Sequence, residues 1–194
     1  RDSLIGVRGI GAFFGFGLMA LASRLDPRVS LTIAFSLQGL SGLYMASFNI
    51  DMTFSQVAWA GIIQGIGVGM AWVPISVLTF STLDKRYFGE GTAMYHLIRN
   101  VASSFFISIT VAVVLHTGQI SFGNLSSLVT DWNMGLALNF TDQFIENFDQ
   151  VTIKNLTSEV NRQSLMIGYI NSFMLFAIVS FLTIPFLFLI KEKK

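Results

Sequence analysis

The chain has no cysteine and only two histidines among its 194 residues. The lack of cysteine excludes disulfide bonds, thiolate metal ligands and cysteine nucleophiles, and two histidines leave little for a histidine-rich metal site. No nucleophile with a plausible base, phosphate-binding loop or metal-ligand spacing can be recognised in the sequence. We therefore expect a protein that is not an enzyme and that carries no metal or cofactor.

Charged residues are also scarce in this chain. Charged residues make up 12% of the chain and apolar residues 53%, whereas about a quarter of the residues of a soluble domain are charged. The formal net charge is +1, so the basic excess that is typical of a nucleic-acid-binding protein is missing. These proportions indicate an integral membrane protein whose main partner is the lipid bilayer, with no nucleic acid bound.

Five stretches reach the roughly 20 apolar residues that a helix needs to cross a hydrocarbon core about 30 Å thick. They run over 4–23, 29–48, 54–82, 92–116 and 165–190. We predict an all-α, polytopic membrane helix bundle with five transmembrane helices. Its parts are four helices with short loops (1–116), a polar loop (117–164), and a last helix with a basic tail (165–194). The third and fourth stretches are long, which favours a tilt or a kink at Pro74.

Lysine and arginine collect on alternate loops, as expected when these loops are cytoplasmic. Arg24 and Arg28 lie in the first turn, Lys85 and Arg86 in the third, and three lysines in the tail, whereas the second turn has an acid and no base. This pattern predicts a cytoplasmic C-terminus in an inner membrane. It also places the start of the chain on the outer face, so we expect further helices of the same chain before it.

The loop over 117–164 lies on the predicted outer side. Phe140, Phe144, Phe148 and Val151 recur at helical spacing within it, which predicts an amphipathic helix. A helix that rests on its own bundle is the interpretation we favour, and docking of a partner is the alternative.

Two stretches are rich in glycine. Gly11 and Gly15 in the first, and Gly65 and Gly69 in the third, have the four-residue spacing that lets helix backbones approach closely. Static packing and a sliding interface both fit this spacing. Pro74 removes a backbone hydrogen bond within the third stretch, where the wall of a cavity could flex.

Two arginines fall inside predicted spans. Arg8 precedes Arg24 by about 24 Å of helix, and Arg99 lies roughly 10 Å from the cytoplasmic end of its span. A charge in this zone costs a few kcal/mol, so each should face the bundle interior, a partner or a watery cavity. The alternative is that both side chains extend to an interface.

Other polar residues of the spans are uncharged or weakly basic. His96 shares a helix face with Arg99, where it could relay a proton, although we favour an interfacial role. Gln64 should line a helix interface or a cavity. The five spans contain no acidic residue, so a proton-loading carboxylate, if one is needed, would belong to helices outside this chain.

Several motifs resemble one membrane protein family. Arg8-Gly9 stands in a glycine-rich span that ends in Arg24-Leu25-Asp26-Pro27-Arg28, and Gln64-Gly65-Ile66-Gly67-Val68-Gly69 precedes Pro74. A short basic loop, Arg99, a long outer loop and a final helix ending in lysines follow. Together these features resemble helices ten to fourteen of the fourteen-span drug:proton antiporters of the major facilitator superfamily, the EmrB/QacA type. Two positions depart from the family pattern, because Ser23 replaces an acidic residue and Met19 replaces a glycine.

The resemblance implies export of lipophilic compounds in exchange for protons by alternating access. We predict a substrate and proton pathway at Arg8, Arg99, Gln64, Trp72 and His96, of which Arg8 and Arg99 match positions where the resembled family commonly has arginine. The resemblance also implies a cytoplasmic loop built on Arg24, Asp26 and Arg28. In some relatives a periplasmic adaptor protein is a further partner. A carrier of a defined metabolite or siderophore on the same fold, and a membrane scaffold that acts through the 117–164 loop, are the alternatives.

Overall fold

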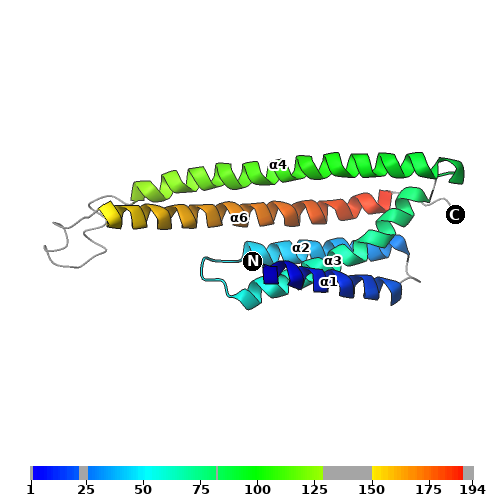
Figure 1. Cartoon of the computed structure of the whole chain (residues 1–194), viewed down its shortest axis with the longest axis horizontal. Coiled ribbons are helices and arrows are strands. Elements are labelled where there is room, and N and C mark those ends of the chain that lie inside the picture. Colours follow the sequence, from blue (N-terminus) through cyan, green and yellow to red (C-terminus); the bar gives the residue numbers. More distant parts are fainter. Residues whose placement is uncertain (1, 22–25, 82, 129–149, 190–194) are drawn as a thin grey trace. The chain divides into compact units, whose positions relative to one another are not determined.

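The structure is a computed structural model that describes residues 2–21, 26–81, 83–128 and 150–189. Over these residues the chain is helical except for the turns between the helices, and it contains no strand. The prediction of an all-α helix bundle is confirmed. The elements, labelled in Figure 1, are α1 (Asp2–Leu21), α2 (Pro27–Ala46), α3 (Phe54–Phe80), the 3-10 turn η1 (Lys85–Tyr87), α4 (Phe88–Leu128) and α6 (Gln150–Leu189).

The starts of α2 and α3 follow from local sequence. Pro27 occupies the first turn of α2, where its missing N–H costs nothing and its fixed φ suits a helix. The carbonyl of Asp26 accepts hydrogen bonds from the N–H groups of Val29 (2.9 Å) and Ser30 (3.2 Å). At the start of α3, the N–H of Thr53 donates to Gln56 Oε1 at 2.9 Å, which is one half of a capping box. N–H groups at or just before the first turn of each helix thus find acceptors in neighbouring residues.

The chain divides into two compact units. The first contains residues 1–107 and 173–194, and the second contains residues 108–172. Helices α4 and α6 each run through the boundary without a break. The helix boundaries therefore do not coincide with the unit boundaries.

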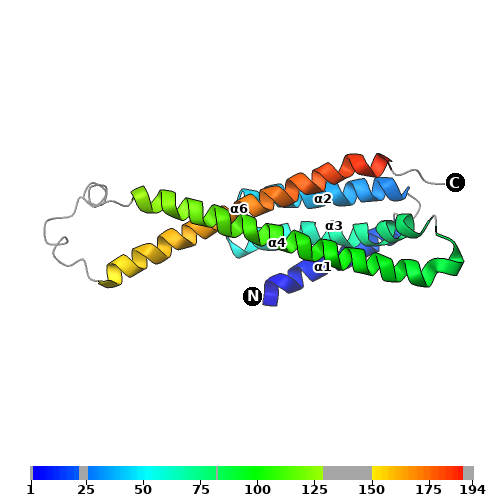
Figure 2. The same cartoon turned by 90° about the horizontal axis from the view of Figure 1, so that it is seen from above.

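In the first unit, α3 contacts both α1 and α2 (Figures 1 and 2). Ser41 of α2, which is fully buried, donates a hydrogen bond from Oγ to the carbonyl of Ala60 in α3 at 2.9 Å. Phe181 of α6 lies against Gly39 of α2, where an added Cβ would meet its ring at 2.7 Å. The buried apolar cluster consists of Leu31, Ala34, Met70, Ala71 and Leu187. Small and aliphatic side chains from three helices thus form its core.

In the second unit, α4 and α6 cross at small residues. A Cβ added to Gly168 would meet the carbonyl oxygen of Val114 at 2.5 Å, and one added to Gly118 would lie 3.5 Å from Leu165. Ser164 is buried at this crossing, and its Oγ donates to the carbonyl of Val160 at 2.7 Å. Glycine permits the close approach, and the serine satisfies its hydroxyl within its own helix.

Helices α4 and α6 are much longer than the predicted spans. The prediction ended the fourth span at His116 and began the fifth at Leu165, whereas the helices continue to Leu128 and begin at Gln150. No proline interrupts 117–128 or 150–164. Local hydrogen bonds such as Ser127 Oγ to the carbonyl of Asn124, at 2.8 Å, support the polar turns. Hydropathy locates the edge of a span. The helix itself continues until a residue such as proline interrupts its backbone hydrogen bonds.

The lengths of α4 and α6 bear directly on their placement in a bilayer. Their 41 and 40 residues correspond to about 60 Å of helix each, roughly twice the thickness of the hydrocarbon core. A part of each helix therefore has to lie outside that core. The polar segments 117–128 and 150–164 are the parts whose composition suits water or head groups.

Four helical segments are long and apolar enough to cross a membrane. They are α2, α3, the segment 85–127 that contains η1 and most of α4, and residues 157–189 of α6. In α1, residues 6–19 form a shorter apolar helix. The chain is a multi-pass membrane protein by these properties. The predicted aromatic stripe at Phe140, Phe144 and Phe148 lies outside the described residues.

Candidate functional site

The predicted glycines of α1 and α3 face each other. A Cβ added to Gly65 would overlap the carbonyl oxygen of Arg8 and lie 2.8 Å from the backbone nitrogen of Ala12. One added to Gly69 would overlap the carbonyl oxygen of Ala12 and lie 3.0 Å from Cα of Gly15. The obstacles are backbone atoms, which cannot rotate away as a side-chain end can. We call this α1–α3 contact, centred on Gly11, Gly15, Gly65 and Gly69, the glycine seam.

All four glycines of the seam are buried. A Cβ on Gly11 would lie 2.9 Å from Cα of Ile62, and one on Gly15 would lie 3.0 Å from Cα of Ile66. The backbones thus touch over about two turns of each helix. Such contact without side chains permits both tight packing and sliding, and a moving role for the seam remains a prediction.

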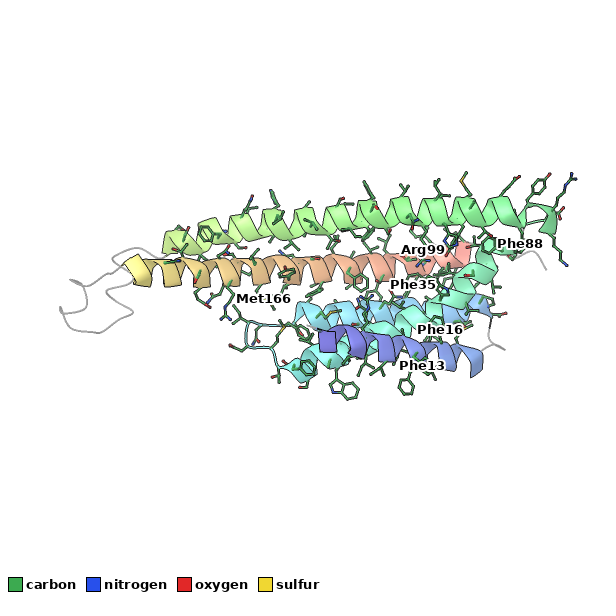
Figure 3. All side chains as sticks on the ribbon, viewed as in Figure 1. Phe13, Phe16, Phe35, Phe88, Arg99 and Met166 are labelled. Atoms are coloured by element: carbon green, nitrogen blue, oxygen red, sulfur yellow. The ribbon has the colours of Figure 1, made fainter. Side chains whose placement is uncertain are left out.

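Arg99 of α4 and Trp72 of α3 form a pair. The guanidinium carbon of Arg99 lies 4.0 Å from the centroid of the Trp72 ring, and Figure 3 shows the arginine on its long helix. A cation over an aromatic face gains about 0.5–2 kcal/mol, with the larger values where water is excluded. Both side chains are exposed, Trp72 to 45%. The two side chains contact each other, and both are still accessible from outside.

The pair lies well inside its helices. Arg99 follows the start of α4 at Phe88 by about 16 Å of helix, and Trp72 precedes the end of α3 at Phe80 by about 12 Å. Both residues therefore lie about two to three turns inside their helices. An interior role for Arg99 remains a prediction.

Arg8 is not part of this pair. Its Cβ lies 3.9 Å from the position of a Cβ on Gly61, and Gly61 precedes Trp72 by about 16 Å along α3. Arg8 is exposed on α1. The structure therefore places the two predicted arginines at separate levels of the bundle.

The remaining predicted residues occupy other places in the first unit. Gln64 is half-buried in α3, one residue before Gly65 of the seam. His96 is exposed, and its ring lies 5.5 Å from that of Tyr95. Pro74 is fully buried inside α3, which continues past it to Phe80.

The predicted cytoplasmic loop is described in part. Arg24 and Ser23 lie outside the described residues. Asp26 is exposed before α2, and its side chain makes no capping bond there. Arg28 is half-buried, and its Nε is buried without a hydrogen-bond partner. Met19, at the position where the resembled family has glycine, is 8% exposed.

An aromatic cluster at the α3–α4 connection was not predicted. Phe80 stacks on Phe88 with centroids 5.5 Å apart and meets Tyr95 edge-on at 5.7 Å. These rings bracket η1, whose Lys85 and Arg86 are exposed. The sequence signal for this cluster was the presence of aromatic residues on both sides of a short basic turn, among them Tyr95, a residue type that is enriched at membrane interfaces.

Comparison with curated proteins finds bacterial export and resistance proteins. The chain is 24% identical to the multidrug export protein EmrB of Haemophilus influenzae over 149 residues, or 75% of this chain and 29% of that protein. It is 24% identical to the colistin resistance protein EmrB of Acinetobacter baumannii over 187 residues, with 91% and 36% covered. It is 20% identical to the fatty acid resistance protein FarB of Neisseria gonorrhoeae over 172 residues, with 87% and 34% covered.

No protein-family model matches the chain, and neither does any solved structure. The chain spans about a third of the length of the three relatives. Over that length it is similar to EmrB-type bacterial export and resistance transporters.

Proposed function

We propose that this chain forms one part of a secondary active transporter of the major facilitator superfamily that exports lipophilic compounds in exchange for protons. The observation that carries the proposal is the similarity to EmrB-type proteins, which in one relative extends over 91% of the chain. Helices suited to membrane crossing and the absence of recognisable catalytic groups agree with it. We place the protein in the inner membrane with its C-terminus in the cytoplasm, as the distribution of basic residues suggests.

Export would use alternating access, in which two helical bundles rock around a central site. The glycine seam supports this part of the proposal, because backbones in contact without interdigitated side chains can shift with little steric resistance. Pro74, buried inside α3, leaves the carbonyl one turn earlier without its usual donor and so provides a point for bending.

Proton coupling would require a titratable group in the membrane. The predicted spans hold no carboxylate, so we assign proton loading to a carboxylate on the other helices of the transporter. Arg99 would then supply a fixed positive charge on the wall that this chain contributes, held at its depth by Trp72.

The proposal is tested by dye retention. The full-length protein that contains this chain is expressed in a bacterium that lacks its main efflux pumps, and retention of a lipophilic dye is measured with and without a protonophore. We expect retention to fall on expression and to recover when the protonophore collapses the proton gradient. Unchanged retention across a panel of cationic, neutral and anionic dyes would contradict export of lipophilic compounds.

A variant connects the test to the pair in the structure. Arg99→Ala removes the charge and the contact with Trp72, and we expect loss of export with normal membrane expression. Arg86→Ala, at an exposed position of η1, is the matched control and should export normally. Normal export by Arg99→Ala would assign Arg99 to the interfacial interpretation.

A further inference from the structure

The aromatic cluster at the α3–α4 connection joins the two helices at a defined position. The ring of Phe80, the last residue of α3, lies 5.5 Å from that of Phe88 and 5.7 Å from that of Tyr95, measured between centroids. Phe88 begins α4, and Tyr95 follows seven residues later, about 10 Å along the same face of that helix. One ring of α3 thus contacts two rings of α4 that lie two turns apart.

The turn beside the aromatic cluster is also well defined. The N–H of Tyr87 donates to the carbonyl of Asp84 at 2.9 Å, and the N–H of Leu83 donates to the carbonyl of Phe80 at 3.2 Å. The side chain of Leu83 packs on Gly91 of α4, where an added Cβ would overlap it. Contacts before and after the turn therefore fix both the rotation of α4 about its axis and its height along α3.

The pair of Arg99 and Trp72 joins the same two helices, further from the turn. Arg99 follows Tyr95 by four residues, which is about 6 Å along α4 and about 40° around it. Trp72 precedes Phe80 by eight residues, about 12 Å along α3. Figure 3 labels Phe88 and Arg99 on the one long helix. The aromatic cluster and the pair are thus successive contacts between α3 and α4.

Little packing confines the pair itself. Both side chains are exposed, and arginine is a long side chain with many rotamers. The surface of a helix lies roughly 5–6 Å from its axis, so a rotation of α4 by about 30° would move a group there by about 3 Å. The guanidinium carbon lies 4.0 Å from the centroid of Trp72, and the attraction requires a cation over the ring within about 6 Å. Such a rotation would therefore move the guanidinium off the face of the ring.

We propose that the aromatic cluster is a positioning element for Arg99. It sets the rotation of α4 at which the guanidinium lies on Trp72, and Tyr95 is its member nearest to the pair. The importance of this positioning for export rests on the proposed function, whereas the positioning itself does not. The alternative role of these rings is to anchor the turn at a membrane interface, which requires no effect on the pair.

The contact is followed by fluorine NMR on the full-length protein in detergent micelles, labelled with 5-fluorotryptophan. The resonance of Trp72 is assigned by its absence from Trp72→Phe, and its chemical shift in Arg99→Ala defines the ring without the cation. We expect Tyr95→Ala to move the resonance most of the way to that value. Tyr95→Phe, which keeps the ring, should leave it in place. In the Arg99→Ala background, Tyr95→Ala should cause no further shift, because Tyr95 acts through the arginine.

Tyr44 provides the matched control. It forms an edge-on ring pair with Phe48 at 5.3 Å, near the C-terminal end of α2. Tyr44→Ala therefore removes the same kind of contact elsewhere and should leave the Trp72 resonance unchanged. Size-exclusion profiles identify any variant that fails to fold. If Tyr95→Ala fails, Tyr95→Leu, which keeps apolar volume and loses the ring, takes its place.

The positioning and its role in export can fail separately. A Trp72 resonance that stays in place in Tyr95→Ala and Tyr95→Leu would overturn the positioning and favour the interface anchor. A resonance that does not respond to Arg99→Ala would overturn it as well, because the pair itself would be absent.

Dye export is then measured on the same variants. We expect export to be lost in Tyr95→Ala and kept in Tyr95→Phe. A shifted resonance with normal export in Tyr95→Ala would overturn the role in export alone. A shifted resonance in Tyr95→Ala, when the unmodified protein exports no dye, would support the positioning and contradict the proposed function. Dye export by a protein whose Trp72 resonance ignores Tyr95 would do the reverse.

Discussion

The glycine seam gives the sharpest prediction about stability, because the structure supplies a matched pair of substitutions. Gly65→Ala adds a methyl group where the carbonyl oxygen of Arg8 already lies, with the backbone nitrogen of Ala12 at 2.8 Å. Gly17→Ala adds the same group on α1, where nothing lies within 4 Å. Both residues are in helices, so the change in helix propensity is shared and only the steric term differs.

The magnitude follows from the geometry. Carbon contacts are optimal at about 3.5–4.0 Å, so α1 and α3 have to separate by roughly 1 Å to admit the methyl group on Gly65. Overpacking of this kind costs about 1–3 kcal/mol. Replacing a helical glycine by alanine gains up to about 1 kcal/mol where space is available. Because the gain in helix propensity is common to both variants, we expect Gly65→Ala to be less stable than Gly17→Ala by about 1–3 kcal/mol, the steric cost alone.

The assay is unfolding of the full-length protein in mixed micelles with increasing dodecyl sulfate, followed by circular dichroism or tryptophan fluorescence. The unfolding midpoints of the two variants and the unmodified protein are compared at equal protein concentration. If Gly65→Ala unfolds at or above the midpoint of Gly17→Ala, the helices are not in backbone contact at Gly65, and the seam as described is wrong.

Three further predictions test other parts of the structure. A cysteine at Ser126, exposed in the polar part of α4, should react with a membrane-impermeant maleimide, while one at Val111 should be protected; equal labelling would contradict the placement of 117–128 outside the hydrocarbon core. Gly168→Ala should disturb the α4–α6 crossing by about 1–3 kcal/mol, whereas Gly123→Ala, with nothing within 4 Å, should not, and equal unfolding midpoints would refute the crossing. Ser41→Ala should cost about 0.6 kcal/mol through the lost bond to α3; an unchanged midpoint would show that this interhelical bond contributes nothing.

The individual site residues were accessible from sequence because unusual residue types in an apolar span stand out. Arg99 and Trp72 could each be singled out in this way, as could the glycines at four-residue spacing. Their contacts could not be inferred, because a pair on different helices depends on which faces the helices present to each other. Only the tertiary structure therefore shows the Arg99–Trp72 contact and the packing of Gly65 against the backbone of Arg8 and Ala12.

The ends of α4 and α6 show a different limit. Hydropathy predicted boundaries at His116 and Leu165 because the residues beyond them are polar. The helices continue because polarity does not break a helix, and neither 117–128 nor 150–164 contains a proline or a residue with positive φ. The end of an apolar span is set by hydropathy, whereas the end of a helix is set by backbone conformation, so the two need not coincide.

By itself the sequence determined the all-helical membrane class, the order of the apolar segments, and the residues that are costly in lipid. These properties depend on composition along one segment, which sets its transfer free energy and its helix length. The tertiary structure decided which glycines touch, what partner Arg99 has and how far α4 and α6 extend as helices. Those depend on close approach between segments distant in sequence, and on backbone continuity, which composition does not encode.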